Sequence, residues 1–504
     1  MEGIFMKRLL AILLFLALVT GLAACGQPSV SRDTLTYIAF APSDSLVPLD
    51  IGLCEPNVMH AIYEGLVKMD TDGNIAPMLA KRWDDSGEKT VFYLDQNAKF
   101  HDGTPVTADD VIFSLDLFFK GTYSYGFKSR IASYEKNDDH TVTLYKAAPY
   151  VNLFTFSIEN IFIIPKAVYE KDPAAFEKAP VGSGPYQFVS KDNDGMITLK
   201  AFDGYHLGKA EVENIIVKPP VDPSTAVIAI QTGEADMFMG APISQLSVFD
   251  NDDKAKVVLE KNSWSANTLL PLSNRLAQDH NLRKAIFHAV NRANAVALAN
   301  ENIGEPAVNL FAKRLMGEFA DKSYGPLYDE KLAKDYLSKS HYDGSPITIT
   351  IWQETALAES VQSDLKKIGI NAKIEQLDGN AWFDKLEKGE LELTIVPYGA
   401  FSGTLESMLI SMSSTGANYG DHMDKNANYD ALIKQMQTET DEGKRKELIG
   451  KALEILYERA DVSNLFDTPF AYIINSDFDY TSKAGAGSLC LYFGDIKLKS
   501  GEQR

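Results

Sequence analysis

Cysteine, positive charge and long apolar runs are all scarce in this sequence of 504 residues. Three cysteines are too few for a disulfide framework or a structural zinc site. The 49 basic residues are outnumbered by 69 acidic ones, and no basic cluster offsets the net charge of −20. Such a chain would repel a phosphate backbone, so we expect no nucleic acid partner. Beyond residue 24 no apolar segment is long enough to span a bilayer.

Sequence motifs of catalysis are missing as well. The chain contains no H-E-x-x-H, no G-x-S-x-G and no G-x-x-x-x-G-K-[ST] for cradling phosphates. The "GSG" at 182–184 lacks the further glycine of a dinucleotide fingerprint, so it predicts a hinge or a tight turn. A nucleophile or a phosphate loop usually leaves a local signature, and we therefore expect neither an enzyme nor a bound cofactor.

The N-terminus carries a targeting signal. Lys7 and Arg8 precede an apolar run over 9–24, which has the length of a signal-peptide core rather than of a transmembrane helix. The run ends at "LAAC", which resembles the bacterial lipobox and implies cleavage before Cys25 and attachment of diacylglycerol to that cysteine. We predict a signal peptide at 1–24, a lipidated tether at 25–32 and a location on the outer face of the cytoplasmic membrane. The alternative is an ordinary secretory signal with an incidental cysteine.

The remaining chain is too long for one compact core, and its pattern is mixed α/β. Alternating residues predict strands at 34–40, 90–94 and 141–145, and Thr107 is placed to cap a helix. In the second half, the spacing of apolar residues predicts helices at 281–299 and 358–370 and strands at 346–352 and 372–377. Two amphipathic helices are expected within 429–460, followed by a strand at 469–475. The order strand, helix, strand at 346–377 predicts an α/β unit with a right-handed crossover.

One uncharged stretch stands out in this acidic chain. Between Glu392 and Glu406 no residue is charged, and a strand-like run at 393–396 leads into Tyr398, Gly399, Ala400 and Phe401. Glycine lets another group approach the backbone closely because it lacks a Cβ atom. The pattern fits either a packed turn in a core or the wall of a pocket, with the two rings supplying apolar area.

Five segments spread through the chain are similar to one known family. They are "YEGLVKMDTDGNIAPMLAKRWDDS", "FHDGTPVTADDVIFSL", "APVGSGPYQF", "NLRKAIFHAVNR" and "DLKKIGINAKIEQLDGNAWF". In this order they resemble the peptide/nickel family of extracellular solute-binding proteins, the ligand receptors of ABC importers. The resemblance implies a periplasmic-binding-protein-like α/β fold in which two lobes close on a cleft, plus a smaller inserted domain.

The resemblance also implies a domain plan and a set of partners. Domain I would combine 33–60, 185–270 and 470–504, domain II would span 61–184, and domain III would span 271–469. We expect a monomer that binds a small-molecule or peptide ligand, ABC permease subunits and, through its lipid, the membrane. The alternative is a surface hydrolase or a chaperone-like protein on the same fold. A buried acid/base pair with shifted pKa values in the cleft would favour the enzyme, and an uncharged aromatic cleft would favour the receptor.

By the resemblance, the stretch Tyr398, Gly399, Ala400 and Phe401 lies in the cleft and bears on the ligand. Peptide-binding members carry there an aspartate that pairs with the α-amino group of the peptide, and the corresponding residue of this chain is Phe401. Nickel-binding members have aromatic-Gly-Ala-Pro and hold a metal chelate with arginines and a histidine. The segment at 117–127 offers Tyr123 and Tyr125, but no arginine precedes Arg130. We assign no metal, and a peptide, a nickel or metallophore chelate, or an opine or sugar all remain open.

Further candidate ligand residues come from three other places. The resemblance implies that 50–56 forms the first cleft wall, with Ile51, Leu53 and Cys54 facing the ligand. Cys54 also fits a small buried hydrophobe or a bond to Cys490. Trp264 and Trp382 would stack on a ligand, although an indole is as often a core residue as a contact.

Overall fold

The computed structural model describes most of the chain from residue 33 onward. The described residues are 33–39, 42–43, 45–48, 55–69, 75–120, 130–147, 153, 161–322, 327–352, 355–398, 405–414, 423, 425–480 and 491–499. Within these ranges no helix combines the length and the apolar character that crossing a membrane requires. The predicted signal peptide and the tether at 25–32 lie outside the described residues.

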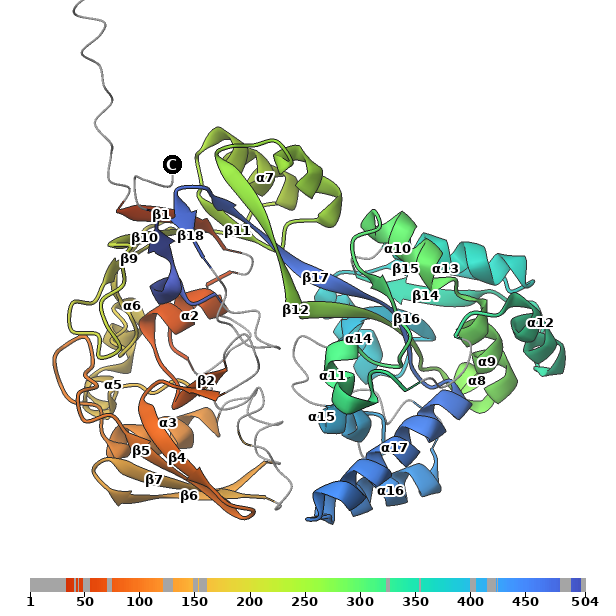
Figure 1. The fold of residues 1–504 in the computed structure, drawn as a ribbon, viewed down its shortest axis with the longest axis horizontal. Coiled ribbons are helices and arrows are strands. Elements are labelled where there is room, and N and C mark those ends of the chain that lie inside the picture. The colour runs from red at the N-terminus through yellow and green to blue at the C-terminus, as the bar shows by residue number, and fades with distance from the viewer. Residues whose placement is uncertain are drawn as a thin grey trace, which may run out of the picture.

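Two lobes are joined by two long antiparallel strands, which run across the middle of Figure 1. These strands are β12 (Ala255–Pro271) and β17 (Ser463–Asn475). They lie inside one large sheet with the strand order β15-β14-β16-β12-β17-β11-β1-β10-β9-β8, and β13 (Glu305–Pro306) pairs with β17 off this path. The same sheet therefore continues from one lobe into the other.

The first lobe takes its strands from both ends and the middle of the chain. Its elements are β1 (Thr34–Ile38), α2 (Pro56–Ile62), β8 (Tyr186–Lys191), β9 (Ile197–Ala201), β10 (Asn214–Lys218), α7 (Pro223–Thr232), β11 (Met237–Met239), η3 (Ile243–Phe249), β18 (Phe478–Asp479), η6 (Phe493–Asp495) and β19 (Lys497–Leu498). The predicted strand at 34–40 is present as β1, which pairs in parallel with β10 and β11. Tyr37, Tyr186, Tyr472 and Phe493 meet in one buried core.

A separate four-stranded sheet lies below α2 in Figure 1 and has its own apolar core. Its strand order is β4 (Ala80–Asp85), β5 (Lys89–Leu94), β7 (Thr141–Lys146) and β6 (Ile131–Asp138), and near it lie β2 (Val67–Met69), β3 (Ile75–Pro77), α3 (Ala108–Phe118), α5 (Lys166–Lys171) and α6 (Pro173–Lys178). Helix α3 begins after Thr107, as predicted. The Thr107 N–H donates to Asp110 Oδ2 over 2.9 Å, which satisfies a backbone donor at the helix start.

The glycines of "VGSGPY" allow the chain to pass directly against α2. A Cβ atom on Gly182 would lie 1.9 Å from the Ile62 carbonyl oxygen, and one on Gly184 would lie 2.4 Å from that of Ala61. The Gly184 N–H donates to the Ile62 carbonyl over 2.9 Å. A side chain at either position would push the two backbones apart, so this motif is structural.

The second lobe packs helices around the other end of the large sheet. Its elements are α8 (Asn274–Gln278), α9 (His280–Ala289), α10 (Arg292–Asn300), α11 (Lys313–Met316), η4 (Gly317–Phe319), α12 (Glu330–Lys339), β14 (Ile347–Ile351), α13 (Thr355–Lys367), β15 (Ala372–Gln376), α14 (Gly379–Glu387), β16 (Leu393–Tyr398), α15 (Leu405–Ser411), α16 (Ala427–Thr438) and α17 (Glu442–Arg459). The predicted strand–helix–strand unit is present, with β14 and β15 parallel around α13. The helical pattern at 281–299 is divided into α9 and α10 because Asn291 caps the second helix, accepting the Asn294 N–H over 3.1 Å.

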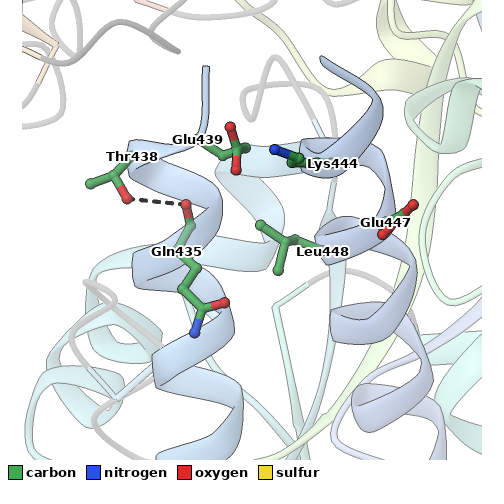
Figure 2. Close-up of a pocket in the computed structure, with 6 residues that line it drawn as sticks. All are labelled: Gln435, Thr438, Glu439, Lys444, Glu447 and Leu448. Atoms are coloured by element: carbon green, nitrogen blue, oxygen red, sulfur yellow. Dashed lines mark hydrogen bonds between the residues drawn. The ribbon is translucent and has the colours of Figure 1, made fainter. Parts of the chain in front are cut away.

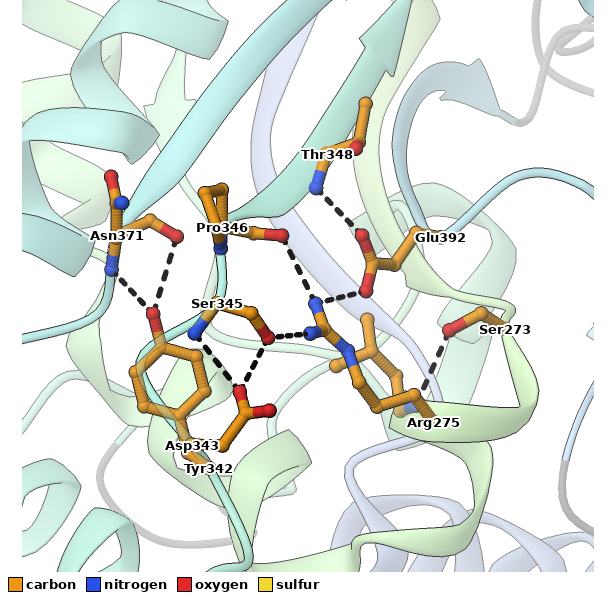
Figure 3. Close-up of polar contacts among 10 residues, drawn as sticks. Ser273, Arg275, Tyr342, Asp343, Ser345, Pro346, Thr348, Asn371 and Glu392 are labelled. Carbon is orange, nitrogen blue, oxygen red and sulfur yellow. Dashed lines mark hydrogen bonds and ion pairs between the residues drawn. The ribbon is translucent and has the colours of Figure 1, made fainter.

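A polar cluster at one edge of the second lobe fixes the ends of three strands (Figure 3). Arg275 pairs with Glu392, which precedes β16, and donates to Ser345 Oγ over 2.6 Å just before β14. Glu392 also accepts the Thr348 N–H over 2.7 Å. Since Arg275 follows the carboxyl end of β12, this cluster locks the amino ends of β14 and β16 to that end of β12.

The predicted three-domain boundaries stay a prediction, but the cores show which segments pack together. Phe162, Ile164 and Phe176 fall within the predicted domain II, and their side chains join the core of the first lobe. The core beneath the four-stranded sheet instead gathers residues such as Phe92 and Leu144.

A buried polar cluster joins the first lobe to the four-stranded sheet. His206 Nε2 lies 3.1 and 3.2 Å from the two carboxylate oxygens of Glu64, and its Nδ1 lies 3.7 Å from Asp95 Oδ2. The Tyr205 hydroxyl donates to the same Glu64 over 2.9 Å. Burial by itself lowers the pKa of His206, but the hydrogen bond and charge of Glu64, together with Asp95, outweigh it and raise the pKa above its usual value.

We predict that this cluster stabilises the fold more at acidic than at alkaline pH. A histidine whose pKa is raised in the folded state contributes its full stability below the unfolded pKa of about 6.5, and that contribution is lost as pH rises through the higher folded value. His206→Gln should lower the free energy of unfolding by about 1–3 kcal/mol at pH 6 and by less at pH 8.5. Urea unfolding of both proteins across this range measures the difference, and an equal loss at both pH values would contradict the prediction.

Candidate functional site

The two lobes meet where the pairing of β12 with β17 is interrupted. Glu260 pairs with Phe470 and Trp264 pairs with Pro469, so residues 261–263 of β12 have no register partner in β17. Pro469 has no backbone N–H to donate. Extra residues in one strand bend and twist a β-ribbon locally. The crossing therefore has the geometry of a hinge, with continuous pairing on both sides of a bulge.

The carboxyl ends of the second lobe's parallel strands point to this crossing. In the register, Tyr398 at the end of β16 lies opposite Ala266 of β12, which in turn lies opposite Asp467 of β17. β14 runs parallel to both β15 and β16, so the three strands end at the same edge. Ligands of open α/β sheets bind beyond the carboxyl ends of the strands. Figure 1 shows α11, α14 and α15 on the side of this lobe that faces the first lobe.

Most of the predicted ligand residues lie outside the described part of the chain. They are Ile51, Leu53, Cys54, Tyr123, Tyr125, Gly399, Ala400 and Phe401, and the lipidation residue Cys25 and Cys490 lie outside it too. Of Trp264 and Tyr398 the structure describes only the backbone. The strand register brings these two residues to neighbouring strands at the crossing, offset by two positions. Their contacts with a ligand stay predictions.

Trp382 is a core residue in this structure. Its side chain is 1% exposed and belongs to an apolar core of the second lobe. The indole N–H donates to Thr394 Oγ1 over 3.0 Å, so its polar group is satisfied inside the protein. We therefore leave Trp382 out of the solute site proposed below.

Trp352 and Phe383 both contact the ring of Trp382 and form an aromatic pair that the sequence interpretation missed. Phe383 is 50% exposed, and its ring centroid lies 5.7 Å from that of the half-buried Trp352. Trp352 directly follows β14, and Phe383 lies in the middle of α14, which follows β15. Ligand sites of such sheets lie beyond the carboxyl ends of the strands. A search at and beyond the ends of the predicted strands at 346–352 and 372–377 could therefore have identified both residues.

Glu55 is a fully buried carboxylate within the predicted first wall at 50–56. Its Oε1 accepts the Tyr37 hydroxyl over 3.0 Å and the side-chain amide of Asn57 over 2.5 Å. The Asn57 oxygen in turn accepts the Leu491 N–H over 2.5 Å. These bonds fix the position at which the wall segment leads into α2.

Asp467 is another carboxylate, and it lies in β17 close to the crossing. It accepts the Lys313 N–H over 2.9 Å and the side-chain amide of Asn464 over 2.7 Å. Burial raises the pKa of Asp467, and these two hydrogen bonds only partly oppose that effect. Among the residues that the structure describes, no three His, Cys, Asp or Glu side chains are grouped to hold a metal ion.

Two pockets lined by described residues lie away from the crossing. Figure 2 shows one of about 330 Å³ between α16 and α17, where Leu448 is the apolar residue and the others are Gln435, Thr438, Glu439, Lys444 and Glu447. The other, of about 230 Å³, lies between α3 and α5 and includes Asp109, Phe113 and Lys166. Neither contains a residue of the predicted ligand site.

Two lobes joined by a bulged strand pair, with strand ends facing the junction, define the periplasmic-binding-protein-like fold predicted above. The model of the bacterial extracellular solute-binding proteins, family 5 (middle), matches residues 74–420, and the chain belongs to this family. Its relatives are binding proteins that serve ABC transporters and are not enzymes.

Three comparisons illustrate the range of this family. The dipeptide-binding protein of Escherichia coli K12 is 24% identical over 482 residues, which cover 86% of this chain and 89% of that protein. NikA from Brucella suis, solved in complex with Fe(III)-EDTA, has a TM-score of 0.81 and 23% identity over 92% of this chain and 100% of its own. AgaA from A. tumefaciens R10, solved with agropinic acid, has a TM-score of 0.77 and 23% identity over 93% of this chain and 99% of its own. The solved structures show the fold alone.

The different environments of Trp382 and Phe383 give a matched pair of variants. We predict that Trp382→Ala lowers the free energy of unfolding by about 3–5 kcal/mol because it opens a core cavity. Phe383→Ala should cost less than about 1 kcal/mol, since the ring is already half exposed, but should reduce the solute that co-purifies with the protein. Urea unfolding and quantitative mass spectrometry measure the two effects.

Leu298→Ala, at a 67% exposed position on α10, is the control for loss of an exposed apolar side chain. It should change neither the stability nor the retained solute. A Trp382→Ala protein with normal stability and no solute would contradict the core assignment.

Proposed function

We propose that this chain captures a small solute between its two lobes and delivers it to the permease of an ABC importer. The observation that carries the proposal is the coincidence of three features at one place. The bulged crossing of β12 and β17, the carboxyl ends of β14, β15 and β16, and Tyr398 of the uncharged stretch all lie there. A ligand bound at a hinge can contact both lobes and so favours the closed state.

The proposed solute wall combines residues from the sequence interpretation with the aromatic pair Trp352 and Phe383. Tyr398, Gly399, Ala400 and Phe401 would supply rings and accessible backbone, while Trp352 and Phe383 extend the apolar surface along the same strand ends. Ile51, Leu53, Cys54, Tyr123 and Tyr125 would come from the opposite side, together with Trp264 at the crossing. Burying one ring against a solute contributes about 1.5–3 kcal/mol.

The residue at position 401 restricts the chemistry of the solute. Burying an ammonium group without a countercharge costs several kcal/mol, and a phenylalanine ring has no charge to offer. We propose a solute that has no free α-amino group seated at Phe401, such as a metal chelate or a sugar. A peptide would fit only if its amine reached a different carboxylate.

The solute can be identified directly. Mass spectrometry of the material released by denaturing the purified protein should show one small compound at near-equal molar amount. Calorimetry with that compound should show weaker binding to Phe401→Ala by about 10-fold or more, with thermal stability little changed. Unchanged affinity combined with a large loss of stability would mean that Phe401 is a core residue. A free dipeptide as the released compound would contradict the proposed chemistry.

We further propose that the protein is anchored outside the cytoplasmic membrane through Cys25. Two acyl chains on one cysteine hold a protein stably at a bilayer, whereas one chain binds only marginally. Cys25→Ala should therefore move the protein from the membrane fraction to the soluble or secreted fraction. Cell fractionation followed by a carbonate wash measures this, and a variant that stays in the washed membranes would contradict the anchor.

A further inference from the structure

Arg130 makes a hydrogen bond that crosses from the four-stranded sheet to the second lobe. Its Nη2 donates to Ser407 Oγ over 2.9 Å, although the two residues are 277 positions apart in the chain. Both side chains are partly buried. Arg130 directly precedes β6, and Ser407 lies in α15. The bond thus joins two parts that the crossing of β12 and β17 also connects.

Both ends of this bond are mounted on well-packed elements. The Arg130 carbonyl accepts the Ala147 N–H over 2.8 Å, which holds Arg130 to the strand pair β6–β7. On the other side, Met408 and Leu409 anchor α15 in the core of the second lobe. Because both ends are anchored, the bond limits the separation of the lobes to the reach of one arginine side chain.

The bond is distant from the crossing about which the lobes would rotate. Figure 1 places the sheet that contains β6 and the helix α15 well below the crossing of β12 and β17. A rotation about a hinge displaces atoms in proportion to their distance from it. Lobe opening at the crossing would therefore separate Arg130 from Ser407 and break the bond.

We infer that Arg130 and Ser407 form an inter-lobe latch that stabilises the closed arrangement, and that Arg130 is a positioning residue for solute capture. The inference rests on the proposed function. A guanidinium donor makes a stronger hydrogen bond than a neutral one, and Arg130 presents it in a rigid planar group. Any interaction made only in the closed state shifts the population toward that state, so the solute has to supply less of the closing free energy.

The test uses small-angle X-ray scattering of the protein after its solute has been removed by unfolding and refolding. Arg130→Ala and Ser407→Ala should each raise the ratio of open to closed molecules by about 3- to 10-fold, the range expected for one hydrogen bond. The double variant should open by less than the sum of the two single effects, because both variants remove the shared hydrogen bond. Ser407→Asp should close the protein more than the wild type does, and only when Arg130 is present.

Arg82→Ala is the matched control, since Arg82 lies in the same four-stranded sheet and pairs locally with Asp84 over 3.7 Å. It should leave the scattering curve unchanged. If Arg130→Ala lowers thermal stability, Ser407→Ala decides alone, because its hydroxyl is not part of that sheet. Scattering curves of Ser407→Ala that equal the wild type, or effects that add in the double variant, would overturn the latch. These measurements need no solute, so a failed search for a solute would count against the proposed function and not against the latch.

Discussion

Both lobes are built on the same pair of antiparallel strands, β12 and β17. A two-stranded ribbon is marginally stable by itself, but here each half of the pair is flanked by further strands of its own lobe. The halves are therefore rigid, and the ladder is weakest at residues 261–263, where β12 has no register partner. Rotation between the lobes is confined to the place where the strand ends of the second lobe converge.

Buried charged residues hold the two ends of β17 in place and so help to keep this strand in register with its neighbours. At the start, Arg292 donates to Ser463 Oγ over 2.7 Å and to the Asn464 carbonyl over 3.0 Å. At the end, Asp236 accepts the side-chain amide of Asn475 over 3.1 Å. Burial lowers the pKa of Arg292 to about 9, and its bonds to carbonyl oxygens satisfy the buried donors. The motif "NLRKAIFHAVNR" thus serves the hinge strands through Arg292.

The local patterns in the sequence predicted local structure well, whereas long-range pairing could not be read from them. Alternation and helical spacing were enough for β14, α13 and β15, and Thr107 marked the start of α3. The bulge at 261–263 could not be predicted, since it depends on a partner strand about 200 residues away. Trp382 and Phe383 are neighbours of similar character, and only the packing of α14 decides that one is buried and the other half exposed. Arg130 and Ser407 are 277 positions apart in the chain, and the arrangement of the lobes brings them together.

The carboxylates of Glu55 and Asp467 bear on the chemistry of the solute. Glu55 already accepts donors from Tyr37 and Asn57, and Asp467 accepts the Lys313 N–H and the Asn464 amide. Burial also raises the pKa of Asp467, because it disfavours the charged carboxylate. Recruiting Glu55 to an ammonium would leave its buried donors unsatisfied, at about 1–3 kcal/mol for each donor. Recruiting Asp467 would break its two present hydrogen bonds. Neither carboxylate therefore replaces a countercharge at position 401 without loss, and this favours a solute that has no ammonium group at that position.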